Sequence, residues 1–152
     1  MTMLRNVLLL FIIFSMGNAE VELAVKCPPG WKNFGVRCYK YFSQSVNWIT
    51  AERNCQSLGA NLASVHSKLE NDFLLSLVPS STLAWVGAHD GEQEGQWLWS
   101  DGTAYDYTNW CSNEPNSANG AENCLEINWT SNRCWNDGSC SVSNKYVCVT
   151  DM

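Results

Sequence analysis

The sequence predicts an α+β domain in which two helices come first and short strands follow. Two stretches before Pro79 carry apolar residues at helical spacing, and beyond Pro79 the helical period does not recur. The chain also contains eight cysteines among 152 residues, a content that indicates a fold held together by disulfides. This length suits a single domain with its own core.

Residues 1–19 have the pattern of a secretory signal peptide. Arg5 precedes the apolar run from Val7 to Phe14, and the small residues Gly17-Asn18-Ala19 follow it. The run is shorter than the roughly 20 residues needed to cross a bilayer, so a single-pass anchor is the weaker alternative. We expect cleavage after Ala19, a secreted extracellular protein, and cysteines in disulfides rather than in zinc sites.

Capping residues mark the two helices. Asn47 is a candidate N-cap, and Gly59 marks the end of the first helix. The apolar side of this helix carries Trp48, Ala51, Cys55 and Leu58. Ser67 and Glu70 form a capping-box pattern that opens the second helix, which Pro79 ends. Its apolar stripe consists of Phe73, Leu74 and Leu77.

The predicted strands are short and surround one long polar segment. They cover Arg37 to Phe42, Leu83 to Ala88, Gln96 to Trp99, Cys124 to Asn128 and Lys145 to Val149. Trp97 and Trp99 alternate with Leu98, as packing residues of a strand do. Between Gly102 and Ala121 lies a segment rich in Asn, Ser, Gly and Asp, which we expect to be ordered and functional.

The charge of the chain excludes one class of partner. Its formal net charge is −6 and its pI about 4.7, and its basic residues are scattered. A phosphate-binding surface needs a basic stripe, so nucleic acid is not an expected partner. The eight tryptophans are interpreted mainly as core and strand packing.

Six residues late in the chain bear the clearest sign of function: Glu114-Pro115-Asn116, Glu122 and Asn136-Asp137. All but the proline offer side-chain oxygen, and Ca²⁺ takes about 6–8 oxygen ligands. Amides can give their carbonyl to the metal and their NH₂ to another group. A partly filled Ca²⁺ shell with donors and acceptors around it suits the vicinal diol of a sugar.

Together with these oxygen ligands, a set of framework residues resembles the C-type lectin-like domain. The set comprises Cys55 in the first helix, the strand Trp85-Val86-Gly87-Ala88, Trp135 before Asn136-Asp137, and Cys140 and Cys148. The resemblance covers residues 27–149, nearly the whole mature chain. It implies a fold of two helices, small antiparallel sheets and a long Ca²⁺-binding loop.

The resemblance also implies a disulfide frame, which the residues alone leave open because eight cysteines allow 105 connectivities. The family frame pairs Cys55 with Cys148, Cys124 with Cys140, and Cys27 with Cys38. Cys111 and Cys134 have no counterpart in the common frame and should pair with each other.

The family's principal Ca²⁺ site matches Glu114, Asn116, Glu122, Asn136 and Asp137, with Pro115 as a cis residue. The same residues would bind carbohydrate, and the Glu-Pro-Asn order implies sugars with equatorial 3- and 4-hydroxyls, the mannose type. Members with Gln-Pro-Asp there prefer galactose. The resemblance further suggests a role in innate immunity through microbial or cell-surface glycans.

The chain departs from the family at an auxiliary Ca²⁺ site. Asp90 and Glu94 match half of it, but the other two acids fall at the neutral Ser117 and Asn123. A second ion is therefore expected to be weak or absent. The extra Cys111–Cys134 bridge would lie against the primary site.

Three hypotheses follow. The leading one is a secreted, Ca²⁺-dependent lectin whose weak single-sugar affinity calls for several sites, and hence for a homo-oligomer. The alternative is Ca²⁺-dependent ice binding, because the Cys111–Cys134 pair resembles type II antifreeze proteins. An enzyme is the third and is not expected, because the cysteines are assigned to disulfides and the two histidines, His66 and His89, are taken to be isolated from each other and from any plausible nucleophile. Asn128-Trp129-Thr130 is a sequon, so Asn128 is a candidate glycosylation site.

Overall fold

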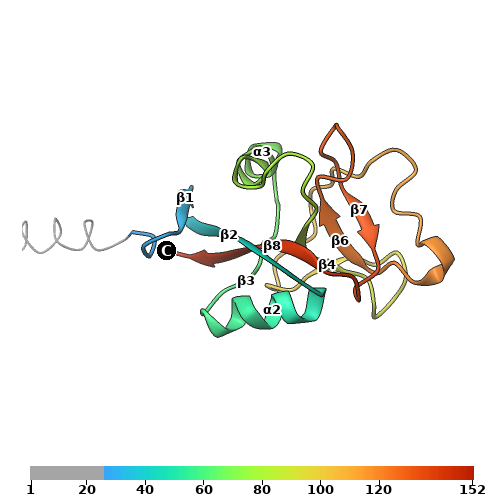
Figure 1. The fold of residues 1–152 in the computed structure, drawn as a ribbon, viewed down its shortest axis with the longest axis horizontal. Helices are drawn as coiled ribbons and strands as arrows, with labels where there is room; N and C mark the ends of the chain where they lie inside the picture. The colour runs from blue at the N-terminus through green and yellow to red at the C-terminus, as the bar shows by residue number, and fades with distance from the viewer. Residues whose placement is uncertain (1–25) are drawn as a thin grey trace, which may run out of the picture.

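The computed structural model describes residues 26–152, which fold around one mixed sheet flanked by two helices (Figure 1). The elements are β1 (Lys32–Phe34), β2 (Arg37–Val46), α2 (Trp48–Ser57), β3 (Asn61–Leu62), α3 (Lys68–Leu77), β4 (Ala84–His89), β5 (Leu98–Trp99), η1 (Ala118–Gly120), β6 (Cys124–Ile127), β7 (Asn136–Gly138) and β8 (Asn144–Asp151). The predicted α+β class is confirmed. The predicted signal peptide at residues 1–19 lies outside the described residues.

The sheet has the order β1-β2-β8-β4-β6-β7, with β3 added to β8 and β5 to β4. The long antiparallel pair β2–β8 runs through the middle, and α2 and α3 lie on opposite sides of it (Figure 1). A parallel contact between β4 and β8 joins this pair to β6 and β7. Within residues 26–152, no helix combines the length and apolar character that a membrane crossing requires.

The two chain ends of the described domain lie at one pole, and η1 lies at the other (Figure 1). The end of β8 pairs with the start of β2, Arg37 facing Asp151. The Met152 N–H donates to the Val36 carbonyl at 3.1 Å. The sheet therefore separates the ends of the chain from the polar loop that carries η1.

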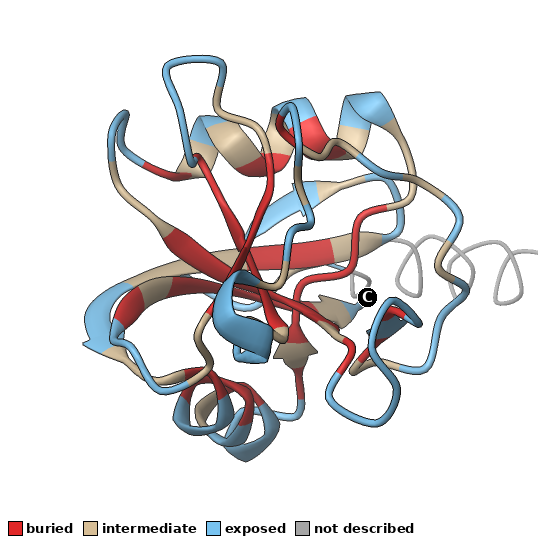
Figure 2. Ribbon diagram, turned by 90° about the vertical axis from the view of Figure 1, so that its right-hand side faces the viewer, coloured by how far each residue is buried: buried red, intermediate tan, exposed pale blue. Residues whose placement is uncertain are grey.

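The core is built from the strands that lie between the two helices, which Figure 2 shows as buried ribbon between exposed loops. Trp135 is fully buried in the larger cluster, and its indole N–H donates to Asn71 Oδ1 at 2.9 Å. Trp85 is fully buried in the second cluster, beside α2. Trp97 and Trp99 are buried while Leu98 is exposed, as the predicted strand alternation requires.

Both helices begin at the predicted caps. The Asn47 side chain accepts from Thr50 N at 3.0 Å, and Ser67 Oγ accepts from Glu70 N at 3.1 Å. The capping box is only half formed, because Glu70 Oε1 accepts from Arg37 instead of returning to Ser67. Leu58, predicted on the apolar side of α2, is its C-cap and is exposed, since the helix ends before the residue can pack against the core.

The strand predictions are right in the core and incomplete at its edges. The predicted strands from Leu83, Cys124 and Lys145 correspond to β4, β6 and β8. The first predicted strand corresponds to β2, which continues past Phe42 to Val46. β1, β3 and β7 were not predicted, because two of them are exposed or very short and β7 consists of polar Asn136, Asp137 and Gly138.

The structure contains four disulfides, and no cysteine of residues 26–152 is free. The pairs are Cys27–Cys38, Cys55–Cys148, Cys111–Cys134 and Cys124–Cys140. They are the pairs that the family resemblance implies. Cys55–Cys148 joins α2 to β8, and Cys111–Cys134 holds the long polar loop against the β6–β7 connection.

Candidate metal centre

The five predicted ligands come from two places that the fold brings together. Glu114, Asn116 and Glu122 lie in the loop around η1, while Asn136 and Asp137 begin β7. The Glu114–Pro115 peptide is cis, as the resemblance implies. This pole of the molecule faces the viewer in Figure 2.

Asp137 is the residue that attaches the loop to the sheet. It is fully buried, and its two carboxylate oxygens accept the backbone N–H groups of Asn116 at 3.1 Å and Ser117 at 2.7 Å. One residue further, the Ala118 N–H contacts Asn116 Oδ1 at 3.2 Å and Glu122 Oε1 at 3.0 Å. These hydrogen bonds bring Asn116, Glu122 and Asp137 into one small region.

Glu114 contributes an enclosed carboxylate oxygen with no partner. Its Oε2 is buried and makes no hydrogen bond within the described residues. Desolvation raises the pKa of this carboxyl, and the nearby charges of Asp137 and Glu122 raise it further. An unpaired anionic oxygen among like charges is unfavourable unless a proton or a cation neutralises it. The donor chemistry therefore fits a hard divalent cation.

Asn136 faces the carboxylate of Glu126, which lies beneath the site and is not among the predicted ligands. Its amide nitrogen donates to Glu126 Oε1 at 2.8 Å, and Asn144 donates to Glu126 Oε2 at 2.8 Å. Glu126 is buried, and burial raises its pKa while the two amide donors lower it. The available signal was an acid inside the otherwise apolar strand Cys124–Ile127.

This arrangement fixes the orientation of Asn136. Because its nitrogen is held by Glu126, its carbonyl oxygen is the atom left for a metal. Glu126 also occupies the space above Gly138, where an added Cβ would approach the carboxylate oxygens to 3.0–3.1 Å.

The five residues are neighbours, and three of them are acids while two are amides. No group of three or more His, Cys, Asp or Glu side chains in residues 26–152 is arranged to hold a metal ion. Asp137 and Glu122 accept backbone N–H groups, and two of the five ligands are amides. A bound ion would compete with these N–H groups for the same oxygens.

At the auxiliary position, an amide occupies the space between two acids. Asn123, in the amide orientation that satisfies its neighbours, donates to Asp90 Oδ1 and Glu94 Oε2, both at 3.0 Å. Burial raises the pKa of Asp90, and the charges of Glu94 and Asp137 add to the rise. The amide gives a physical reason for a weak second site, which stays a prediction.

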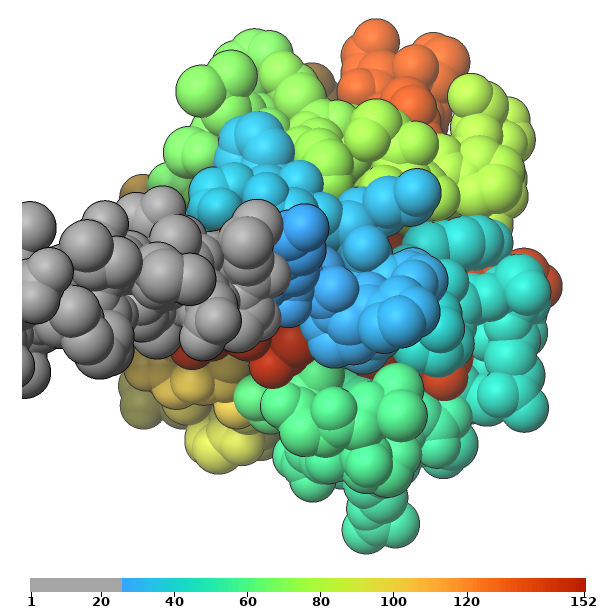
Figure 3. Space-filling view, turned by 90° about the vertical axis from the view of Figure 1, so that its left-hand side faces the viewer, coloured from blue at the N-terminus to red at the C-terminus, as the bar shows by residue number. Residues whose placement is uncertain are grey.

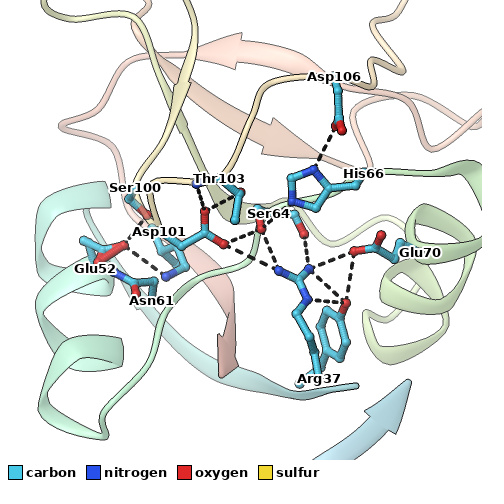
Figure 4. A network of polar contacts seen from close by, with 12 residues as sticks. Arg37, Glu52, Asn61, Ser64, His66, Glu70, Ser100, Asp101, Thr103 and Asp106 are labelled. Atoms are coloured by element: carbon cyan, nitrogen blue, oxygen red, sulfur yellow. Dashed lines mark hydrogen bonds and ion pairs between the residues drawn. The ribbon is translucent and has the colours of Figure 1, made fainter. Parts of the chain in front are cut away.

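His66 is not isolated, so that expectation was wrong. Its Nε2 lies 3.1 Å from Ser64 Oγ, two residues away in the sequence. Its Nδ1 lies 2.8 Å from Asp106 Oδ1, because the segment after β5 passes beside the segment between β3 and α3 (Figure 4). Ser64 is fully buried, however, and its hydroxyl also contacts Asp101 and accepts from Arg37. A nucleophile has to reach its substrate, so this Ser-His-Asp order does not make a hydrolytic site. His89 is also paired, with its Nδ1 2.9 Å from Glu92 Oε2.

Asn128, the candidate glycosylation site, has its side chain enclosed. It is 3% exposed, and its amide nitrogen donates to the carbonyls of Pro79 at 3.0 Å and Thr82 at 2.8 Å. Its oxygen accepts from Arg133 Nε at 2.8 Å. A glycan would be attached to this nitrogen, so the folded structure disfavours the modification.

The fold and the loop chemistry agree with a family match over most of the chain. The model of the Lectin C-type domain matches residues 44–150, and the protein belongs to this family. The predicted domain limits at residues 27 and 149 remain predictions.

Similar proteins of this family include both lectins and ice-structuring proteins. The chain is 47% identical over 122 residues to ladderlectin of Oncorhynchus mykiss, a match that covers 78% of this chain and 64% of that protein. It is 38% identical over 133 residues to a type-2 ice-structuring protein of Hemitripterus americanus, covering 88% and 80%. It is 32% identical over 150 residues to the galactose-specific lectin nattectin of Thalassophryne nattereri, covering 94% of each.

Similar solved structures also include both an antifreeze protein and a carbohydrate-recognition domain. The herring type II antifreeze protein has a TM-score of 0.80 and 33% identity, covering 83% of this chain and 99% of that one. The cow CD23 carbohydrate-recognition domain, solved in the presence of a GlcNAc2Man3 oligosaccharide, has a TM-score of 0.78 and 33% identity, covering 85% and 98%. The family and these relatives are lectins and ice-structuring proteins rather than enzymes.

Proposed function

We propose that this protein is a secreted, Ca²⁺-dependent carbohydrate-binding protein that takes mannose-type sugars and is not an enzyme. The observation that carries the proposal is the buried, unpartnered Glu114 Oε2 beside Asp137 and Glu122. The membership of the family and the lectins among the relatives support the same class.

Each of the five predicted ligands would have a defined role in binding the ion and the sugar. Oxygens of Glu114, Asn116, Glu122, Asn136 and Asp137 would hold one Ca²⁺, and the ion would supply direct coordination of two neighbouring sugar hydroxyls. Glu114 and Glu122 would accept hydrogen bonds from those hydroxyls, while the Asn116 amide would donate to them. Asn136 Nδ2 already donates to Glu126, so its second hydrogen is the one left for a sugar.

Sugar class is the finer part of the proposal. The order Glu114-Pro115-Asn116 supports mannose-type ligands, whereas nattectin is named as galactose-specific. A single site should bind weakly, near a Kd of ~1 mM. Useful binding to a microbial or cell surface would then require several sites in a homo-oligomer, because linked sites raise apparent affinity by about 10²–10⁴.

Calorimetric titration tests the metal and the sugar in sequence. Ca²⁺ is added to metal-free protein, followed by methyl α-mannoside and then methyl α-galactoside. We expect one ion per chain and binding of the mannoside only after Ca²⁺ has been added. Glu114→Gln should lower Ca²⁺ affinity by at least about tenfold, because removing one ligand charge weakens a hard cation site.

Asp72→Asn is the matched control for that variant. It also removes one carboxylate, but Asp72 lies on α3, where its partner is Lys68. Equal Ca²⁺ affinity for Glu114→Gln and the wild type would refute the metal assignment, and tighter binding of galactoside would refute the mannose-type preference.

Ice binding is the second candidate, favoured by the ice-structuring relatives and by the fit to the herring antifreeze protein. Measurement of thermal hysteresis with Ca²⁺ and with EDTA separates the two functions. A freezing-point depression beyond the colligative value, together with no retention on mannan, would favour this candidate over the lectin.

A further inference from the structure

Away from the metal centre lies a cavity of about 500 Å³, here called the Trp129 cleft. It lies between the segment after α3 and the β6–β7 connection, and its lining includes Ser80, Ser81, Trp129, Thr130, Ser131 and Arg133. Figure 3 shows the two segments side by side, the first in light green and the second in orange. None of the five predicted Ca²⁺ ligands lines it.

Trp129 is the most unusual residue of this cleft. The structure describes all eight tryptophans of the chain, and Trp129, at 46% exposure, is the only one that is exposed. Core packing accounts for the buried ones but not for this one. An exposed indole offers a flat apolar face and one N–H donor, which suits a ligand that is apolar on one side and polar at its edge.

Arg133 supplies the charge of the cleft. Its Nε donates to Asn128 Oδ1 at 2.8 Å, and its Nη2 donates to the carbonyls of Leu75 at 2.8 Å and Val78 at 2.7 Å. Within the described residues its Nη1 has no hydrogen-bond partner. The guanidinium is therefore fixed in place with one donor group left over, and among the described residues of the lining it is the one charged side chain.

Apart from Leu83, the remaining side chains of the described lining are polar, and its backbone is unusual. Hydroxyls of Ser80, Ser81, Thr130 and Ser131 can donate or accept hydrogen bonds. Ser81, Asn128 and Arg133 have positive φ values of 65°, 70° and 58°. Among the described residues, the other three non-glycine residues with positive φ lie in the loop around η1. Such conformations gather at functional sites, so the two regions share this property.

We propose that the Trp129 cleft is a second glycan-binding subsite, independent of Ca²⁺, that takes a pyranose with an acidic substituent. The C–H face of the sugar ring would pack on the Trp129 indole, and its hydroxyls would bond to the serine and threonine side chains. A carboxylate or sulfate on the sugar would accept a charge-assisted hydrogen bond from Arg133 Nη1. The volume lies within the range of small-ligand sites, about 300–1,000 Å³.

The test uses ¹H–¹⁵N spectra of the full folded domain in EDTA, with methyl β-glucuronide and methyl β-glucoside as a matched pair. The glucuronide should shift the Trp129 indole N–H signal at millimolar concentration, and the glucoside should bind roughly tenfold more weakly. Trp129→Ala should abolish the shifts of the neighbouring backbone signals, and Trp129→Phe, which keeps an aromatic face, should preserve them.

The Glu114→Gln variant separates this subsite from the metal centre. It should bind the glucuronide as the wild type does, even though its Ca²⁺ affinity is lowered. A response that needs Ca²⁺, a response that survives Trp129→Ala, or no response of the Trp129 signal to either sugar would overturn the subsite. Equal affinity for the two sugars would overturn the role of Arg133. The wild-type spectrum alone locates the binding, so the test does not depend on the folding of a variant.

Discussion

At the scale of single residues, Asn128 shows that a sequence motif depends on its surroundings. The Asn128-Trp129-Thr130 sequon is present, but the Asn128 nitrogen already donates to two backbone carbonyls. We therefore expect the protein secreted from eukaryotic cells to carry no glycan at Asn128. Mass spectrometry before and after peptide N-glycosidase checks this, and a mass loss on treatment would contradict it.

The same contacts predict a stability effect. Asn128→Ala leaves the Pro79 and Thr82 carbonyls and the Arg133 Nε without their partner, and a buried group left unpaired costs about 1–3 kcal/mol. Urea unfolding measures the loss, and Asn132→Ala, an exposed asparagine of the same connection, is the control. Equal stability of the two variants would show that the Asn128 contacts are not stabilising.

Tyr105 is a second residue whose surroundings make a prediction. Its hydroxyl is buried and has no hydrogen-bond partner among residues 26–152, and burial raises the pKa of Tyr105 to about 12. The unfolded chain loses this proton near pH 10 while the folded chain keeps it, so this group lowers stability as pH rises from about 10 to 12.

Tyr105→Phe removes both the orphaned hydroxyl and its titration. We expect the variant to be as stable as the wild type or slightly more stable at pH 7, and to lose less stability between pH 10 and 12. Thermal unfolding across this range checks the expectation. If Tyr105→Phe lost as much stability between pH 10 and 12 as the wild type, the alkaline loss of stability would belong to other tyrosines.

The oxygen ligands could be predicted from residue types because carboxylates and amides around a proline are a compact signal. The structure adds what spacing cannot show, which is where each oxygen already points. Asp137 accepts two backbone N–H groups, and Asn136 donates to Glu126, its partner on the neighbouring strand β6. The contact of His66 with Asp106 was missed for the same reason, since the tertiary fold brings together two residues that lie 40 positions apart, whereas Ser64 is only two residues from His66.

At the scale of elements, the pairing of β6 with β7 lets Glu126 hold the proposed metal ligand Asn136 in its orientation. Glu126→Gln places an NH₂ group where one of two donors now points, either Asn136 or Asn144. We expect Ca²⁺ affinity to fall by about 10–100-fold, as is typical when a partner that orients a ligand is lost. We also expect stability to fall by about 1–3 kcal/mol.

Calorimetry with Ca²⁺ and urea unfolding measure the two effects on the same samples. Asp72→Asn again controls for the loss of one charge. If Glu126→Gln bound Ca²⁺ as the wild type does, Glu126 would be a support of the sheet alone, with no influence on the ion.

The helices were predictable because their signals are local. Asn47 and Ser67 cap α2 and α3 as expected, and Gly59 adopts the positive φ of 73° that a helix end favours. The missed β7 has no such signal, since Asn136-Asp137-Gly138 is polar and becomes a strand only by pairing with β6. The predicted hydrogen bond from the Glu70 side chain back to the Ser67 backbone does not form. Instead, Arg37 of β2 donates to the Glu70 carboxylate at 2.8 Å, which is a tertiary contact.

At the scale of the whole molecule, the disulfides should stabilise unequally. Cys55–Cys148 spans 93 residues and Cys27–Cys38 spans 11. In the chain-entropy model the longer loop contributes about 4.5 kcal/mol and the shorter about 3 kcal/mol. We expect the Cys55→Ala/Cys148→Ala variant to unfold at clearly lower urea concentration than Cys27→Ala/Cys38→Ala.

Equal unfolding midpoints for the two double variants would count against chain entropy as the main source of this stability. Ca²⁺ binding should persist in Cys27→Ala/Cys38→Ala, because that disulfide ties the segment before β1 to Cys38 of β2, which pairs with Thr150 near the end of β8 and not with the loop around η1.

The position of the chain ends has a practical outcome for display and immobilisation. Residue 26 and Met152 both lie at the pole opposite η1 (Figure 1). A biotin tag, a fusion partner or a multimerising stalk attached to either one would leave the Glu114–Asp137 region pointing away from the support. Sensor chips and bead arrays coated through either end would therefore present every copy in the same outward orientation.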